Sequence, residues 1–472
     1  MAAPFALLQA TAPVVASTPA TGRRPRLRAV FVRRDADRYG FGWPGAAFDP
    51  KALQALYTRT LSSGAEKLGV ELQISHEPLT KLPEMDTFLA ECSQNPPDGV
   101  IIVAMCKDTA WPMINHFIQK RPAKLPTVVF SAMGTSFLDG IQAAIAAAKG
   151  TRTYIASTPD IQWLAFGVRM LHTLWRMKTT RICVVQGKEP CDIVLDAVGT
   201  TLHYVPFTRF SDEYKKVAET AEARAIANYY TRHAKKIVEP TRTDVVNAAK
   251  TYVVCRRLME TEGCDGIAVD CLPHVRGRTA PPPCLAFSKL LDEGVVAACQ
   301  ADWPAALSLQ LVWLLLERPG FMQNICVDTV HNKLVGAHCT SPVRLAGPDQ
   351  PAVPFLLRSH AESGLGVAPQ VLWPAGQPIT ITKFSDATWW VPPKTPQTAA
   401  TAILLGTGRV VQNIDNPPAG GCRTSLVVEV DGLDDVRSLR FLHHQLFVLG
   451  NHKDRLRAYC ELAGLEAKPL WT

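Results

Sequence analysis

The segment "VVAACQADWPAALSLQLVWLLL" places polar side chains between two apolar stretches. Its first five residues predict a buried strand and its last fourteen predict a helix, so Gln300, Ala301 and Asp302 lie where the strand ends. The carboxyl ends of strands are where open α/β folds bind their ligands. The amide of Gln300 can donate and accept hydrogen bonds but cannot act as a general base. Asp302 precedes Trp303 and Pro304, so it also fits the N-cap of the following helix.

Three later motifs combine expected strand ends with side chains that coordinate ions. They place Asn324 in "PGFMQN", His338 in "GAHC", and His443 and His444 in "FLHHQLF". Amide oxygens and imidazole nitrogens both bind divalent ions such as Mn²⁺. Each residue also has a plain structural alternative, because Asn324 can be a turn residue and a histidine can be a hydrogen-bonded core residue.

Up to residue 332 the chain alternates apolar strand-like runs with amphipathic stretches, a pattern typical of βαβ units around a parallel sheet. One cycle starts at "RLRAVFVRR" and another at "IQWLAFGVRMLHTLWRM". The pattern within the second cycle predicts one long helix over 211–233 and another over 241–262. We therefore predict an N-terminal α/β domain over 26–155 and a second α/β domain over 156–332.

The remaining segments of the chain differ from this pattern of alternating strands and helices. After residue 332, short apolar runs are separated by Pro, Gly and Asn, which predicts a β-rich C-terminal domain over 333–472, built as an antiparallel barrel or sandwich. Residues 1–25 read as a disordered tail or as the remnant of an export signal. The only "GTG", at 406–408, lacks the third glycine and the helix of a dinucleotide-binding fingerprint, and no P-loop is present.

Composition narrows the class of protein. Of the 472 residues 47% are hydrophobic and 19% charged, and no apolar run approaches the roughly 18 residues of a membrane helix, so we predict a soluble protein without a membrane partner. The net charge of +8 comes from scattered basic residues, which does not favour a nucleic-acid partner. The thirteen cysteines show no paired framework, which favours a reducing, cytoplasmic location. Export is the alternative if residues 1–22 are the remnant of a signal.

Taken in order, the motifs "CQAD" (299–302), "RPGFMQN" (318–324), "GAHC" (336–339) and "HHQLF" (443–447) resemble those of the L-fucose/L-arabinose isomerase superfamily. The resemblance implies two flavodoxin-like parallel-sheet α/β domains followed by a β-rich, barrel-like domain, assembled as a homo-trimer or homo-hexamer. It also implies an aldose–ketose isomerase of carbohydrate metabolism that works through an enediol on a small-molecule sugar. A Mn²⁺ or similar divalent metal would be held at positions that correspond here to Gln300, Asn324, His338 and His444.

This sequence departs from the superfamily at both carboxylate positions. Gln300 and Asn324 stand where the resemblance implies the acid/base carboxylates, and losing such a group typically lowers the rate by about 10²–10⁴. Asp302 and Asp328 are close enough in the sequence to supply carboxylates to a shifted site. We therefore weigh a sugar isomerase-like protein with an altered site against a non-catalytic or metal-free carbohydrate-binding relative or partner subunit.

Six further positions are candidates for binding the sugar. Trp43, in the loop "RYGFGWPGAAFDP", could stack on a sugar face, and Asp270 follows the strand "DGIAV". A site with cations and no carboxylates would favour an anionic sugar derivative. The structural alternatives are a packed loop for Trp43 and exposed charges on strands for the cationic residues. The substrate-binding candidates are Trp43, Asp270, Asp302, Arg358, His360 and Lys383.

Overall fold

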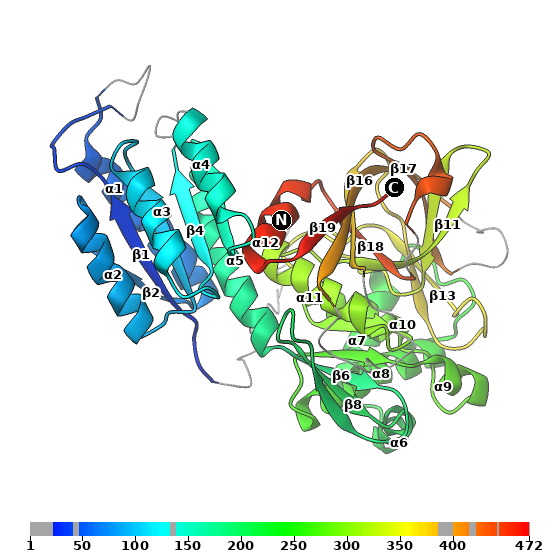
Figure 1. Ribbon diagram of the computed structural model, residues 1–472. Coiled ribbons are helices and arrows are strands. Elements are labelled where there is room, and N and C mark those ends of the chain that lie inside the picture. Colours follow the sequence, from blue (N-terminus) through cyan, green and yellow to red (C-terminus); the bar gives the residue numbers. More distant parts are fainter. Residues whose placement is uncertain are drawn as a thin grey trace, which may run out of the picture.

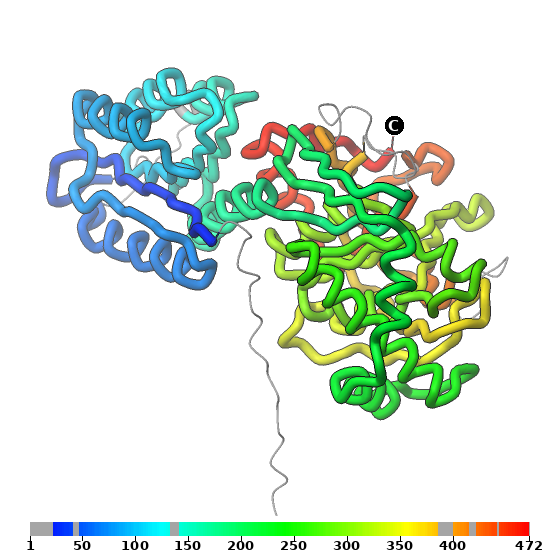
Figure 2. The backbone as a smooth tube through the Cα atoms, turned by 90° about the horizontal axis from the view of Figure 1, so that it is seen from below, coloured from blue at the N-terminus to red at the C-terminus, as the bar shows by residue number. Residues whose placement is uncertain are grey.

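The computed structural model describes residues 22–40, 47–132, 138–385, 400–414, 422–440 and 443–471. These residues form two α/β sheets and a closed antiparallel β-barrel, which confirms the fold class expected from the sequence (Figure 1). Figure 2 shows the first α/β domain as a lobe of its own, joined to the rest of the molecule along α5. Trp43 falls outside the described residues.

The first sheet has the strand order β2-β1-β3-β4-β5, and all of its neighbouring strands are parallel. This is the flavodoxin-like order expected from the sequence. β3 and β4 are buried along their whole length, because helices cover both faces of a parallel sheet. The elements are β1 (Arg26–Val32), α1 (Pro50–Leu68), β2 (Glu71–Ile74), α2 (Leu82–Gln94), β3 (Gly99–Ala104), α3 (Ala110–Lys120), β4 (Thr127–Ser131), α4 (Leu138–Ala148) and β5 (Thr153–Ser157).

The second sheet has the order β10-β9-β6-β8-β7, with β7 antiparallel at one edge. The single helix predicted over 211–233 is wrong: the segment forms two helices, and the Thr220 side chain caps the second by accepting from the backbone N–H of Ala223. The elements are α5 (Gln162–Thr179), β6 (Arg181–Val185), β7 (Cys191–Val194), β8 (Thr201–Val205), α6 (Thr208–Lys216), α7 (Ala221–His233), α8 (Arg242–Thr261), β9 (Gly266–Val269), α9 (Leu272–Gly277), α10 (Cys284–Asp292), β10 (Val296–Cys299) and α11 (Trp303–Leu316).

The barrel closes in the order β15-β18-β11-β12-β17-β16, because β16 also pairs with β15. β11 lies within the range predicted for the second α/β domain, yet it is a barrel strand paired with β12 and β18. Closure leaves no free strand edge in the ring of six, and β19 adds to β16 from outside. The elements are β11 (Phe321–Asp328), β12 (Lys333–His338), β13 (Phe355–Arg358), β14 (Ala368–Val371), β15 (Pro378–Phe384), β16 (Ala402–Asn413), β17 (Thr424–Val430), η4 (Val436–Ser438), β18 (Gln445–Leu449), α12 (Lys453–Ala463) and β19 (Glu466–Pro469).

Two helices join these layers. α5 packs against α1 of the first domain and against α11, which in turn packs on the outer face of barrel strands β15 and β18. α11 is apolar and buried almost all round, since it has barrel on one side and α/β domain on the other. Among the described residues, no helix is both long and apolar enough to cross a membrane.

The strand registers show which side chains point into the barrel. Residues opposite one another in antiparallel strands share a face, and the exposed pair Arg409 and Glu429 marks the outer one. Gly336 belongs to the inner face, where an added Cβ would lie 2.6 Å from the Phe447 ring and 3.0 Å from the Gln323 amide oxygen. The barrel interior therefore needs a residue without a side chain at this position.

The first prediction concerns this packing. Gly336→Ala should lower the free energy of unfolding by about 1–3 kcal/mol, because the new methyl group overpacks the barrel. Gly64→Ala is the control, since its added carbon would lie 3.7 Å from Ala165 and alanine favours helix α1. Urea unfolding followed by circular dichroism measures both variants. Equal stability of the two would contradict the inward orientation of Gly336.

Candidate functional site

The candidate site lies where the carboxyl end of β10 and the first turn of α11 meet one end of the barrel. His338 ends β12, Lys383 is near the end of β15, and His443 and His444 precede β18. We call this group the barrel mouth, defined by Gln300, Asp302, His338, Lys383, His443 and His444.

Asp302 is the centre of the barrel mouth. Its side chain has no solvent exposure, and its Oδ1 accepts a hydrogen bond of 2.7 Å from the backbone N–H of Ala305, so the predicted N-cap is confirmed. Just before it, Gln300 and Ala301 have φ of 55° and 52°, a left-handed conformation that non-glycine residues rarely adopt. Such a turn persists only where surrounding contacts hold it, and it fixes the direction of the Gln300 side chain.

The second carboxylate oxygen of Asp302 binds two cationic or potentially cationic groups. Lys383 Nζ lies 2.7 Å from Asp302 Oδ2, and His444 Nδ1 donates to the same oxygen at 2.8 Å. Lys383 also donates to the backbone carbonyl of His443. Burial opposes ionisation of Asp302, but Lys383 and His444 outweigh it and hold the pKa of the carboxyl below its usual value. Burial lowers the pKa of Lys383, and Asp302 partly offsets this.

The His338 and His444 rings pack edge to face, and the His443 ring is tilted against that of His444. The rings of His443 and His444 have centroids 3.9 Å apart, and those of His338 and His444 are 5.0 Å apart. His338 Nδ1 is hydrogen-bonded to the Thr340 hydroxyl at 3.1 Å. Burial lowers the pKa of His338 to about 3 and that of His443 to about 4, so both rings are neutral at pH 7.

Gln300 and His443 are the two residues of the barrel mouth that are accessible to solvent. The Gln300 side-chain oxygen accepts from His443 Nε2 at 3.2 Å, and the two residues are respectively half-buried and exposed. The structure thus brings together Gln300, His338 and His444 from the predicted metal set, with His443 as a further contact of Gln300.

Asn324 lies on the outer face of the barrel, opposite to the face that carries His338. It pairs with Ala337 on the outer face of the barrel, the face on which Met322 Sδ contacts the backbone N–H of Cys299. Its amide interacts with the Cys422 thiol. Its Oδ1 is buried and has no hydrogen-bond partner among the described residues.

Gln323 is the residue that the sequence argument missed. Its side chain faces the barrel interior beside Gly336, is fully buried, and has no hydrogen-bond partner for either amide atom in the described part of the chain. The alternation in "FMQN" was the available signal, since Phe321 and Gln323 share a face opposite to that of Asn324.

The other predicted positions, Arg358, His360 and Asp270, differ in their surroundings. Arg358 forms a bidentate ion pair with Glu239 and donates to Gln370. His360 is bonded to the Ser363 hydroxyl at 2.9 Å, and its charge, when protonated, disfavours protonation of His338. Asp270 follows β9, the neighbour of β10, and burial raises the pKa of its carboxyl.

Asp328 does not supply a carboxylate at the barrel mouth. It sits at the other end of β11 in the turn to β12, where it accepts from the backbone N–H groups of Val330 and His331 and from the His331 ring.

The barrel mouth does not fit a divalent metal. Across the described ranges, no three His, Cys, Asp or Glu side chains converge in a way that could hold a metal ion. Of the residues that the resemblance assigns to the metal, Gln300 and Asn324 bring no negative charge, and Asn324 faces away from His338. The one carboxylate present, on Asp302, is already neutralised by Lys383.

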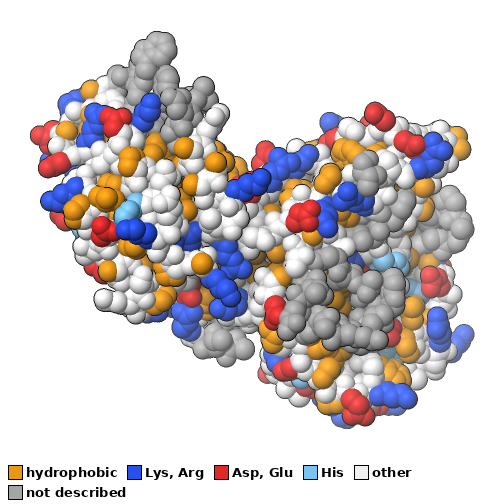
Figure 3. Space-filling view, viewed as in Figure 1, with side chains coloured by type: hydrophobic (Ala, Val, Ile, Leu, Met, Phe, Trp, Pro, Cys, Tyr) orange, Lys and Arg blue, Asp and Glu red, His pale blue; other side chains and the backbone are white. Residues whose placement is uncertain are grey.

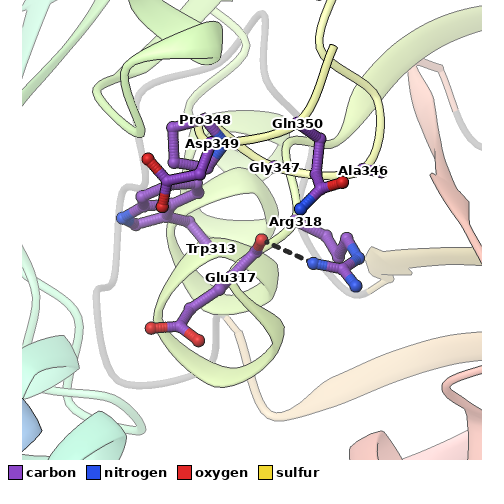
Figure 4. A pocket seen from close by; sticks show the side chains of 8 residues that line it. All are labelled: Trp313, Glu317, Arg318, Ala346, Gly347, Pro348, Asp349 and Gln350. Atoms are coloured by element: carbon purple, nitrogen blue, oxygen red, sulfur yellow. Dashed lines mark hydrogen bonds between the residues drawn. The ribbon is translucent and has the colours of Figure 1, made fainter. Parts of the chain in front are cut away.

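Two surface hollows lie elsewhere. One of about 260 Å³ is at the carboxyl end of α11, where Trp313 lies beside Pro348 and Asp349 and the Glu317 carboxylate points away from them (Figure 4). That end is about 20 Å along α11 from Asp302. The other, of about 450 Å³, lies between the first domain, the end of α5 and α12, at a junction where Lys and Arg side chains show on the surface (Figure 3). Neither is lined by a residue of the barrel mouth.

Comparison with known proteins points to sugar isomerases. Sulfoquinovose isomerases from Priestia aryabhattai and Priestia megaterium are each 24% identical to this chain over 285 residues, which is 58% of this chain and 58% of the relative. The match therefore spans less than two thirds of either relative. No family model matches the sequence. A solved XylFII–LytSN complex mutant is 9% identical and covers 57% of this chain and 90% of that chain, with a TM-score of 0.16, too low to indicate a shared fold.

The second prediction tests the Asp302–Lys383 ion pair. Asp302→Asn and Lys383→Met should each lower the free energy of unfolding by about 3–5 kcal/mol, because each leaves a buried charge without its partner. The double variant removes both charges and keeps an acceptor for the α11 cap, so its loss should be smaller than the sum of the two. Urea unfolding of the four proteins gives the coupling energy. Strict additivity would show that the pair is not coupled.

The third prediction concerns how the free energy of unfolding changes at acidic pH. A histidine whose pKa is depressed in the folded state binds a proton more readily in the unfolded state. The stabilisation from burying neutral His338 is therefore fully present above the unfolded pKa, near 6.5. It is lost as the pH falls toward about 3, the pKa of His338 in the folded protein. One such proton contributes a slope of about 1.4 kcal/mol per pH unit. His338→Gln should reduce the slope of unfolding free energy against pH between 4 and 6. An unchanged slope would contradict neutral burial of His338.

Proposed function

We propose that this chain is a sugar isomerase-like protein that binds a sugar or sugar derivative at the barrel mouth, without the metal-assisted turnover of an aldose–ketose isomerase. The observation that carries the proposal is the state of Asp302: it is the one carboxylate of the barrel mouth, and both of its oxygens are engaged in buried contacts. A general base must reach the proton that it removes, and Asp302 is not exposed to any ligand.

The accessible groups suit hydroxyl recognition. Gln300 and His443 combine an amide with a neutral imidazole, which together donate and accept hydrogen bonds as sugar hydroxyls require. Gln300 also stands at the carboxyl end of β10, the edge at which open α/β sheets bind ligands.

The charge of the barrel mouth does not by itself select an anionic sugar. Arg358 and Lys383, the two cations that favoured such a ligand, are paired with Glu239 and Asp302 respectively. The case for an anionic derivative now comes from the similar proteins, which are named for sulfoquinovose. That sugar is therefore the first ligand to test, beside neutral aldoses.

Isomerase turnover is the second candidate function, and the similarity to sugar isomerases favours it. In that case the exposed His443 would be the base, since its ring is neutral at pH 7. Its depressed pKa makes it a weak base, so exchange of the C2 proton would be slow. Assembly into a homo-trimer or homo-hexamer and a cytoplasmic location stay predictions; light scattering on the purified chain measures the former.

The fourth prediction tests sugar binding. Calorimetry with sulfoquinovose and a panel of aldoses should give binding that Gln300→Ala and His443→Ala each weaken about 3- to 10-fold, the effect of losing one hydrogen bond. His331→Ala, at the exposed β11–β12 turn, is the matched control and should bind as the unaltered chain does. In D₂O, proton NMR of the bound sugar should show no ketose.

Two outcomes would change this reading. Binding that is insensitive to Gln300 and His443 would place the sugar elsewhere. Incorporation of deuterium at C2, lost in His443→Ala, would establish turnover and favour the enzyme over the binding protein.

A further inference from the structure

We propose that the Lys383 ammonium is the built-in cation of the barrel mouth and that, by neutralising Asp302, it keeps a divalent metal out of the site. The inference rests on the proposed function only in taking the barrel mouth as the ligand site. It concerns which cation the site holds, so it can fail or succeed independently of sugar binding.

The first support is the position of Lys383. Its side chain is 3% exposed, and Nζ is fixed by Asp302 Oδ2 at 2.7 Å and by the backbone carbonyl of His443. A length of 2.7 Å is typical of a charge-assisted hydrogen bond. These contacts join β15 to the first turn of α11 and to the residues before β18, so the ammonium occupies the point where the three segments meet.

The second support is that both oxygens of the Asp302 carboxylate, which a metal ion would need as ligands, already accept hydrogen bonds. Asp302 Oδ2 accepts hydrogen bonds from Lys383 Nζ and His444 Nδ1, and Oδ1 accepts one from the Ala305 N–H. A divalent ion bound to Asp302 would have to displace Lys383 or lie close to its positive charge. The histidines cannot compensate, because imidazole contributes no negative charge to the ion.

The third support is charge balance. Two carboxylates with one divalent ion sum to zero, and so do two amides without an ion, while the Asp302–Lys383 pair adds no net charge in either case. Carboxylates at positions 300 and 324 without a metal would leave two negative charges uncompensated, whereas Gln300 and Asn324 add none. The amides and Lys383 are thus two parts of one arrangement that holds the site neutral without a metal.

The experiment measures Mn²⁺ binding by calorimetry on the full chain after EDTA treatment, in the absence of sugar. The unaltered chain should show no binding with a dissociation constant tighter than about 1 mM. Gln300→Glu with Asn324→Asp should bind weakly at most, because Lys383 remains. Adding Lys383→Met to that pair should tighten binding at least about tenfold. Lys383→Arg in the same background is the matched control and should not tighten it, since the positive charge is kept.

Thermal unfolding establishes that each variant is folded before the titration. If Lys383→Met does not fold, the unaltered chain still decides the matter: its affinity for a bound sugar, or its thermal midpoint if no sugar binds, should be the same in EDTA and in 1 mM MnCl₂.

Three results would overturn the inference. They are micromolar Mn²⁺ binding by the unaltered chain, equal Mn²⁺ affinity of the carboxylate variants with and without Lys383, and a sugar affinity or thermal midpoint that rises with Mn²⁺. Absence of sugar binding alone would instead count against the proposed function.

Discussion

The buried ion pair between Asp302 and Lys383 is the interaction on which the barrel mouth depends. Asp302 caps α11 through one oxygen, while its other oxygen holds Lys383 of β15 and His444 before β18. Two charges with almost no solvent exposure are tolerated only when each is fully partnered. The pair therefore links the start of α11 in the second α/β domain to barrel strand β15 and to the segment before β18.

The backbone around the pair is held in sparsely populated conformations. Gln300, Ala301 and His444 all have positive φ, and they flank Asp302 on both of the segments that converge there. Unfavourable local geometry of this kind persists where packing determines the position, and it is concentrated at ligand sites in proteins. It leads the chain directly from an apolar strand into a buried cap, with the Gln300 amide turned toward His443.

The same geometry separates this chain from the metal-dependent isomerases that its motifs resemble. The motifs keep the histidines, but amides stand where the resemblance implies carboxylates, and a lysine neutralises Asp302. Gln300 and Asn324, which carry no charge, and Lys383, which neutralises Asp302, together leave the site without net charge. The chain is similar to sulfoquinovose isomerases over 58% of its length, at 24% identity.

The sequence by itself determined the fold class, the strand-to-helix join at Asp302 and the loss of both acids, because apolar periodicity, capping chemistry and residue type are local properties. Tertiary structure decided the rest. Lys383 and Asp302 are 81 positions apart, and no local pattern encodes their contact. That β11 joins the barrel, and that Gln323 faces inward while Asn324 faces outward, follows from strand register, in which a shift of one residue exchanges the two faces.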